Sequence, residues 1–358
     1  MSAAISLRQV GVAVDVIDID PEWRVYGAGI TITGPTLRAF RQLGILDAIG
    51  REGYFFEQIQ FYSQDGVLSH VMETPVLEAG VPPGGGIMRP VLHRIMSERT
   101  IAEGATVRLG VTLDDFSQHD SGVDVRFSDG GTARYDLIVG ADGSHSALRT
   151  RLFPDAPKLA FTGQGCWRLL AHRAPEITCA QIYFGPSNVK VGVSPCGPDQ
   201  VYMFATLAMP GNPFIAEADL VGRMREIIAP FGGYIRQIHD EMGPESLINY
   251  RPLFATLVRP PWNVGRVGLI GDAVHATTPH LASGAGISVE DGLVLAQEMM
   301  AADTVENGWK AFTARRFERA RLVVENSLEI SRIEQEAGPE PEVKRLMRES
   351  SFALAQPI

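Results

Sequence analysis

The spacing of apolar and polar residues divides the start of the chain into a helix followed by a strand. Residues 2–9 have helical spacing, and Gly11 follows them as a helix stop. The apolar run 12–18 then predicts a buried strand that ends in the carboxylate of Asp18. A helix, a glycine, an apolar strand and a terminal acid form the second half of a nucleotide-binding βαβ unit. The strand and the G-x-G-x-x-G turn of the first half do not precede them in the sequence.

The same pattern predicts helices and strands as far as residue 143. Alternation around Asp65-Gly66 indicates a hairpin at 58–70. The other elements predicted here are helices over 36–49, interrupted at Gly44, and 89–103, and strands over 106–116, 122–127 and 135–139. The last strand runs directly into Gly140-Ala141-Asp142-Gly143.

The pattern changes between residues 158 and 260, where short strand-like runs are separated by proline and glycine. One helix, over 217–228, interrupts them, and the stretch predicts an antiparallel sheet that forms a separate domain. A buried strand over 266–271, a glycine-rich turn, a helix from Val289 onward and a charged helix over 305–336 follow. We expect a nucleotide-binding domain in two parts, 1–157 and 261–304, a substrate domain, 158–260, and a helical segment, 305–358. The hairpin near 58–70 is a candidate addition to the sheet of the substrate domain.

Composition excludes several classes of protein. With 358 residues, of which 45% are hydrophobic and 21% charged, the chain predicts two ordered domains rather than a disordered protein. No apolar run approaches the roughly 18 residues of a membrane span, and no secretory signal is visible. The formal charge of −10 disfavours nucleic acid as a partner. The cysteines at positions 166, 179 and 196 lack disulfide or metal spacing, so we expect free thiols, no metal and a cytoplasmic location.

Two carboxylates stand at the ends of predicted strands. At the end of the first strand, Asp18 can accept hydrogen bonds from ribose hydroxyls, although a solvated strand end is the simpler interpretation. Asp272 follows the strand 266–271 at its carboxyl edge, where ligands of α/β sheets bind. The small residues of 282–286 let a ligand approach the backbone, and the next helix start offers free N–H groups. The strand, the acid and the turn together predict a ligand site.

These motifs resemble those of the flavoprotein aromatic hydroxylases, the single-component FAD-dependent monooxygenases of the p-hydroxybenzoate and salicylate hydroxylase type. The similar segments are, in order, 16–18 with 27–30 (the strand acid and the GAGI sequence), 137–149 (the DG motif) and 271–291 (the GD motif). The resemblance covers nearly the whole chain. It implies an α/β fold, in which a Rossmann-like FAD-binding domain of the p-hydroxybenzoate hydroxylase type is interrupted by an antiparallel-sheet substrate domain and followed by C-terminal helices.

The resemblance also implies a flavin site. Asp18, followed by Ile19, would hold the adenosine ribose, Val111 would surround the adenine, and Arg89 would contact the flavin or its diphosphate. The resemblance implies further contacts with the flavin and, near Asp142, with the path of the nicotinamide. The residues implied are Asp142, Gly143, Gly271, Asp272, Pro279, Ala282, Ser283, Gly284, Ala285 and Gly286. FAD is the implied cofactor, and NAD(P)H is the implied co-substrate.

The start of the chain departs from the family pattern. Counted back from Asp18, Met1 falls just after the last glycine of the family's G-x-G-x-x-G turn. This position leads to the hypothesis of a misassigned or truncated start. A protein that truly begins at Met1 would retain flavin weakly or not at all, because it lacks the main phosphate donors. Ala282-Ser283 also replaces the Gly-Gln of many relatives, a change that keeps the site small.

The implied reaction is hydroxylation of a small aromatic or heteroaromatic substrate with NAD(P)H and O2, through a flavin C4a-hydroperoxide. Because a base near the ring would convert a phenol to the more reactive phenolate, His275 and His280 are candidate catalytic residues. Arg168 is a candidate partner for a substrate carboxylate. Local hydrogen bonding for the histidines and a surface position for the arginine are the simpler interpretations. The arginines of 315–321 alternate with apolar residues, so we expect them on the solvent-exposed side of a packed helix.

Two other classes of function stay open on the sequence alone. A flavoprotein of the same fold could carry out other chemistry, as an epoxidase, a halogenase or a reductase does. The halogenase signature W-x-W-x-I-P does not occur in the chain, which disfavours that option. A non-catalytic relative is the second alternative, because the phosphate-binding turn is missing.

Overall fold

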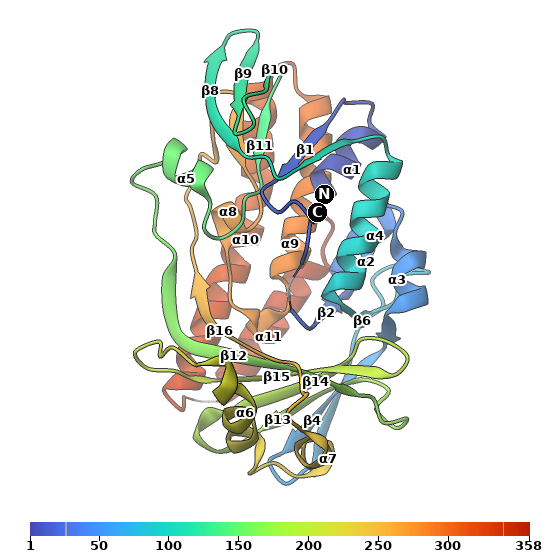
Figure 1. Ribbon diagram of the computed structural model, residues 1–358. Helices are drawn as coiled ribbons and strands as arrows, with labels where there is room; N and C mark the ends of the chain where they lie inside the picture. The colour runs from blue at the N-terminus through green and yellow to red at the C-terminus, as the bar shows by residue number, and fades with distance from the viewer. Residues whose placement is uncertain (26, 339) are drawn as a thin grey trace.

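The structure, a computed structural model, describes residues 1–25, 27–338 and 340–358. Figure 1 shows small sheets and helices in the upper part of the molecule and one wide sheet crossing below them. The helices α9 (Gly284–Ala301) and α10 (Val305–Gln335) lie side by side, and α10 reaches the wide sheet. Among the described residues, no helix has the length and apolar character that crossing a membrane requires.

Two parallel strand pairs organise the upper part. β1 (Asp15–Asp18) pairs with β7 (Thr106–Leu109), and β11 (Ile138–Gly140) pairs with β18 (Val267–Leu269). The remaining strands of this part are β2 (Gly29–Thr33), β3 (Tyr54–Phe56), β6 (Gly84–Met88), β8 (Leu113–His119), β9 (Gly122–Phe127), β10 (Thr132–Tyr135) and β17 (Asn263–Val264). The acids Asp18 and Asp272 thus stand at or just after the carboxyl ends of parallel strands, the edge at which α/β sheets bind ligands.

The helices of the upper part surround these strands. They are α1 (Ser2–Gln9), α2 (Gly34–Gln42), α3 (Leu46–Glu52), α4 (Arg89–Ala102), α5 (Ala147–Leu152), α8 (Asp272–His275), the 3-10 turn η3 (Pro279–Leu281), α9, α10 and α11 (Glu340–Ala355). Local sequence sets several of their starts. Proline stands in the first turn of α2 and of α4, where its missing N–H costs no hydrogen bond. The Thr304 side chain caps α10 by accepting a hydrogen bond from the Asn307 N–H.

The wide sheet has the strand order β16-β12-β15-β14-β13-β4-β5. Its strands are β4 (Gln58–Ser63), β5 (Leu68–Glu73), β12 (Ala160–His172), β13 (Ala180–Phe184), β14 (Lys190–Pro195), β15 (Gln200–Ala208) and β16 (Ile248–Ala255). Every pairing is antiparallel except that of β13 with β4, which is parallel. In Figure 1, helices α6 (Leu220–Ile228) and α7 (Gly233–Glu241) cover the lower face, so the other face turns toward the upper part.

The hydrophobic core consists of separate clusters for the two parts. Trp262, Trp309 and Phe312 centre the cluster that packs α9 and α10 against β18. Trp167 and Tyr183 belong to a second cluster, between the wide sheet and the helices α6 and α7. A third cluster joins α1, α2 and α4 to α9. The three cysteines are free and buried, as the sequence predicted.

Several predicted element boundaries were wrong. Helix α9 begins at Gly284 rather than at Val289. Its first residues are small and pack closely on α2, since a Cβ at Gly286 would lie 2.2 Å from the Thr36 hydroxyl oxygen. The interruption expected at Gly44 in the helix over 36–49 is present: α2 and α3 lie on either side of this glycine, whose φ is +73°. Helix α7 was not predicted, since it lies in a stretch where glycine and proline separate short elements. Helix α11 lies within the helical segment that we expected over 305–358.

A buried ionic network holds α9, α10 and the turn after β18 together. The Asp291 carboxylate accepts hydrogen bonds from the Gly271 N–H at 2.9 Å and from Arg316 Nε at 2.8 Å, and it lies 2.7 Å from His275 Nε2. Glu290 accepts from both Arg316 and Arg319. The prediction that the arginines of this stretch face solvent was therefore wrong for these two: burial of the two acids on α9 requires cationic partners on α10.

Removing the Asp291 carboxylate should cost much of the stability of the fold. Asp291→Ala leaves the Arg316 guanidinium, which is 1% exposed, facing one carboxylate instead of two. Because breaking a buried ion pair leaves an uncompensated charge, we expect the free energy of unfolding at pH 7 to fall by about 3–5 kcal/mol, measured by urea denaturation. Glu318→Ala, at an exposed pair, should cost at most about 1 kcal/mol. Equal losses in the two variants would contradict this account.

Candidate functional site

A cleft of about 3170 Å³ lies between the upper part and the wide sheet. Asp18, Arg89 and Asp272, which stand far apart in the sequence, all line it. Pockets for small ligands commonly measure about 300–1000 Å³, so this cleft has room for a large cofactor and a second molecule. One shared groove for the three residues is what the flavin hypothesis required.

Asp18 stands near the start of α1. The Asp18 carboxylate accepts a hydrogen bond from the Asp20 N–H at 2.8 Å, and Ile19 beside it is 74% exposed. Met1, Ser2, Ala3 and Ala4 also line the cleft. The first N–H groups of a helix have no partner within the helix and carry the positive end of its dipole, so this end of α1 suits an anionic group. Val111, by contrast, packs with Val125 and Phe127 and does not line the cleft.

The DG motif forms a fixed turn at the cleft wall. The Asp142 carboxylate accepts hydrogen bonds from the Ser146 hydroxyl at 2.5 Å and from the Leu148 N–H at 3.0 Å. Gly143 has a φ of +79°, and a Cβ there would meet no atom within 4 Å, so its backbone faces open space. Arg149 donates to the Ala273 carbonyl at 2.8 Å and thereby ties this turn to the GD motif.

The GD motif places Asp272 inside the cleft. Gly271 has a φ of +64°, which glycine adopts without a steric cost, and its N–H is held by Asp291. The Asp272 side chain faces the cleft space, and burial between the cleft walls raises the pKa of its carboxyl, while His275 and Arg89 favour the charged form. A ligand that donates hydrogen bonds or carries positive charge would stabilise the carboxylate here.

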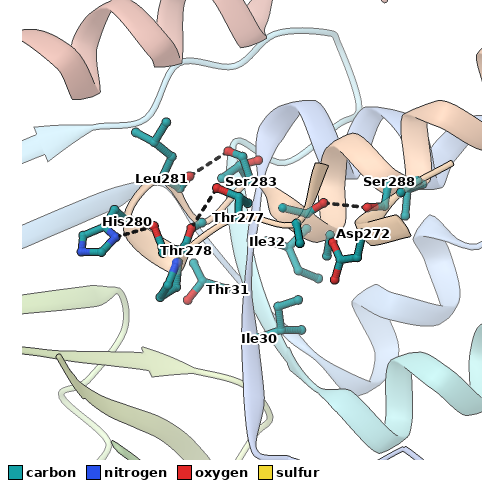
Figure 2. Close-up of a pocket in the computed structure, with 18 of the residues that line it drawn as sticks. Ile30, Thr31, Ile32, Asp272, Thr277, Thr278, His280, Leu281, Ser283 and Ser288 are labelled. Carbon is teal, nitrogen blue, oxygen red and sulfur yellow. Dashed lines mark hydrogen bonds between the residues drawn. The ribbon is translucent and has the colours of Figure 1, made fainter. Parts of the chain in front are cut away.

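The turn after Asp272 brings backbone to the cleft. Pro279, Ala282, Ser283, Gly284 and Ala285 line it, whereas Gly286 is buried against α2. Ala282 has a φ of +49°, a left-handed conformation that is uncommon for a residue with a side chain. The Ser283 hydroxyl donates to the Leu281 carbonyl at 2.7 Å and stabilises the turn, as Figure 2 shows. The N-terminus of α9 therefore opens into the cleft beside small residues.

Arg89 and Arg168 are half-buried arginines that line the cleft. Arg89 extends past Gly27, where a Cβ would lie 3.2 Å from the Arg89 Cδ, and Arg168 Nε donates to the Tyr202 hydroxyl at 3.2 Å. Within the part of the chain that the structure describes, neither guanidinium has a carboxylate within ion-pair distance. Burial lowers the pKa of Arg89 and raises that of Tyr202 to about 12. The two half-buried guanidinium groups favour an anion in this part of the cleft, and Asp272 lies near enough to Arg89 to interact with its charge.

The two candidate histidines point in different directions. His275 is fully buried beside Trp262, bonded to Asp291, and is not among the residues that line the cleft. His280 does line the cleft, and Figure 2 shows its ring at the opposite end of the turn from Asp272. His280 Nδ1 lies 2.8 Å from the Thr278 hydroxyl.

His280 belongs to a charged cluster that the sequence did not reveal. Its Nε2 lies 3.2 Å from a Glu334 oxygen, and the other Glu334 oxygen accepts from Lys190 at 2.5 Å. Burial opposes the charge of Glu334, but Lys190 and His280 hold the pKa of its carboxyl at about 2. Burial and Lys190 lower the pKa of His280. These residues come from η3, α10 and β14, so only the folded chain brings them together.

The residues of the cleft fit FAD. A diphosphate needs N–H donors and positive charge, of which the start of α1 and Arg89 supply a part even without the glycine-rich turn of the family. A ribose needs an acceptor such as Asp18, and a flat ring needs the close backbone of the turn that ends at Ala285. Arg89, which lines the cleft without a carboxylate at ion-pair distance among the described residues, is well placed to bind the anionic part of such a ligand.

Comparisons with known proteins identify the family of the chain. The family model described as "FAD binding domain" matches residues 1–162 and 237–327. The chain is 30% identical over 301 residues to the 2-heptyl-3-hydroxy-4(1H)-quinolone synthase of Pseudomonas aeruginosa, covering 83% of this chain and 77% of that protein. It is 29% identical over 331 residues to the 3-amino-4-hydroxybenzoate 2-monooxygenase PtmB3 of Streptomyces platensis, covering 90% and 81%.

Similarity to solved structures shows the same fold. The crystal structure of Klebsiella pneumoniae HpxO complexed with FAD and uric acid matches with a TM-score of 0.85 and 21% identity over 99% of this chain and 94% of that one. The predicted fold class is thus confirmed, with its FAD-binding domain, its inserted sheet and its C-terminal helices. The chain belongs to the FAD-binding-domain family, and within it to the FAD-dependent monooxygenases of the aromatic hydroxylase type.

Proposed function

We propose that the protein is a monooxygenase that uses NAD(P)H and O2 to hydroxylate a small aromatic or heteroaromatic substrate. The observation that carries this proposal is the single cleft that Asp18, Arg89 and Asp272 share, with the inner face of the wide sheet opposite them. In this proposal, residues 1–157 and 261–304 bind FAD, and residues 158–260 form the wall that selects the substrate. The two relatives, a synthase of a hydroxyquinolone and a monooxygenase of an aminohydroxybenzoate, support a ring substrate.

Bound flavin would supply the redox chemistry, taking two electrons from NAD(P)H and activating O2. The residues of this chain would bind, orient and shield it. Asp18 accepts hydrogen bonds from the ribose, Arg89 neutralises phosphate or flavin charge, and Asp272 accepts from the linking chain. Asp142 holds the turn at Gly143, whose open backbone leaves a path for the nicotinamide. Water must be excluded during oxygen transfer, and aromatic side chains on the sheet, such as Phe204, provide an apolar wall.

Arg168 and Tyr202 are proposed to hold the polar group of the substrate. Their hydrogen bond fixes the guanidinium at the sheet face, and Arg168 keeps further N–H donors for an oxygen anion. Of the two candidate catalytic histidines, only His280 borders the cleft. Its side chain is fully buried, with Nδ1 beside Thr278 and Nε2 beside Glu334, so we propose that it fixes the turn at residues 278–281 rather than taking a proton from the substrate directly. His275 lies outside the cleft, next to Asp291, and would act only by holding the Asp291 carboxylate in place.

Flavin binding tests the proposal. Titration of the purified protein with FAD should give a saturable yellow complex that bleaches on addition of NAD(P)H and bleaches faster with a substrate. Arg89→Met should weaken FAD binding about tenfold to a hundredfold, because it removes a charged hydrogen bond worth about 1.5–3 kcal/mol. Arg94→Met, on an exposed arginine of the same helix, is the control. No saturable binding, or equal binding by both variants, would sink the proposal.

The role of Arg168 predicts a charge-dependent loss of affinity. Arg168→Met should weaken binding of 4-hydroxybenzoate about tenfold or more and leave binding of the neutral 4-hydroxybenzamide nearly unchanged, since only the acid loses an ionic partner. Calorimetric titration of the two ligands measures the ratio. Arg223→Met, whose arginine is 60% exposed and pairs with Glu226, should not change it. An unaltered ratio in the Arg168 variant would show that this side chain does not bind the substrate anion.

The buried position of His280 predicts a pH dependence of stability. Because its folded-state pKa lies below 6.5, the unfolded chain binds more protons as the pH falls below about 6.5, and stability is lost in that range. His280→Asn should reduce the slope of unfolding free energy against pH by up to about 1.4 kcal/mol per pH unit. His119→Asn, at an exposed histidine, serves as the control. Identical slopes for the His280 variant and the wild type would refute the prediction.

A further inference from the structure

The inner face of the wide sheet changes from charged to apolar across its strands. Strand register places Arg168, Tyr202 and Phe204 on this face at β12 and β15. Farther along, the same face carries only apolar side chains and one hydroxyl on β13 and β4, and a histidine and a methionine on β5. The residues of this second region that line the cleft are Ile59, Phe61, Ser63, His70, Met72, Ala180, Ile182 and Phe184.

Along the row that runs from Phe204 to Ile182, no side chain of β14 separates the charged region from the apolar one; Lys190 and Ser194 flank this row. Gly192 of β14 lies between them, and the Phe204 ring occupies the space above it, 2.2 Å from the position of a Cβ, with Ile182 next to it at 3.0 Å. The Phe61 and Phe184 rings then stack with centroids 6.3 Å apart. A continuous apolar floor therefore leads from the site beside Tyr202 to strand β4. It crosses three strand spacings, roughly 14 Å in all.

The apolar floor is exposed on the inside of the molecule rather than on its outer face. Phe184 is 42% exposed and Met72 is 38% exposed, and both line the same cleft as the flavin residues. The outer face of β13 packs against α6 and α7, whereas the edge strand β5 is exposed on both faces (Figure 1). Leu281 and Met347, from η3 and α11, also line this cleft and pack together near α10. The charge of Lys190 at the edge of the floor is neutralised by Glu334. Such a surface favours a slender apolar ligand that is continuous with a polar ring.

We propose that the substrate is amphipathic: an aromatic ring with a polar group beside Arg168 and Tyr202, and an unbranched or prenyl-like hydrocarbon chain that lies along Ile182, Phe184 and Phe61. This assignment rests on the proposed function for the chemistry at the ring. The binding of the chain itself depends only on the sheet face. Each buried methylene group should strengthen binding about fourfold, because it removes apolar area from water.

A series of 4-n-alkylphenols, from methyl to heptyl, tests the proposal by calorimetric titration of the full chain with FAD present. We expect the dissociation constant to fall about threefold to fourfold per methylene over this range. Phe184→Ser and Met72→Ser should each flatten this dependence and leave the affinity for 4-methylphenol within about twofold. Leu247→Ser, at a leucine that is 72% exposed and lies outside the cleft, should preserve the full dependence.

The outcomes separate this inference from its alternatives. Affinity that does not change with chain length overturns the inference, even if the protein binds FAD and hydroxylates short phenols. A steep dependence on chain length without any reduction of flavin by NAD(P)H supports the apolar subsite and removes the proposed function. If Phe184→Ser changes the oligomeric state in sedimentation and does not alter the chain-length dependence, a second copy of the chain covers this face, and the inference is overturned.

Discussion

The site depends on one buried carboxylate. Asp291, which is fully buried on α9, accepts hydrogen bonds from the N–H of Gly271 and from Arg316 of α10, and His275 completes its surroundings. A buried carboxylate is stable only when its charge is compensated, so the helix, its neighbour and the turn must keep their relative positions. The residue that follows this turn is Asp272. Its position at the cleft is thus set by an interaction that no ligand takes part in.

The charged residues that stabilise the fold have partners of opposite charge in the protein, whereas the arginines that we assign to binding have none at ion-pair distance among the described residues. Glu290, Asp291 and Glu334 are buried and have cationic partners within 3 Å. Arg89 and Arg168 are half-buried and line the cleft, with no acid at ion-pair distance among the described residues. Their guanidinium groups therefore keep N–H donors that an anionic ligand could use. This contrast supports assigning the anionic parts of cofactor and substrate to the two arginines.

The sequence predicted what local pattern and motif spacing encode. The sequence predicted the strand ends at Asp18 and Asp272 and the small-residue turn that leads from Asp272 into α9. It also predicted the fold class. The sequence did not predict ion pairs between residues that are far apart in the chain. An arginine such as Arg316 on an amphipathic helix has the pattern of a solvated side chain, and nothing nearby in the sequence signals that it faces two acids. Lys190 and Glu334 are separated by 144 positions, so their pairing exists only in the folded chain.

The central claim is that the cleft between the upper part and the wide sheet is a flavin site, and a crystal structure of the protein with FAD tests it most directly. The account predicts the flavin ring against the backbone of residues 282–285, with Arg89 and Asp272 within hydrogen-bond distance of the cofactor. Electron density for FAD on another surface, or a cleft whose arginines contact only protein groups while FAD is bound elsewhere, would contradict the account.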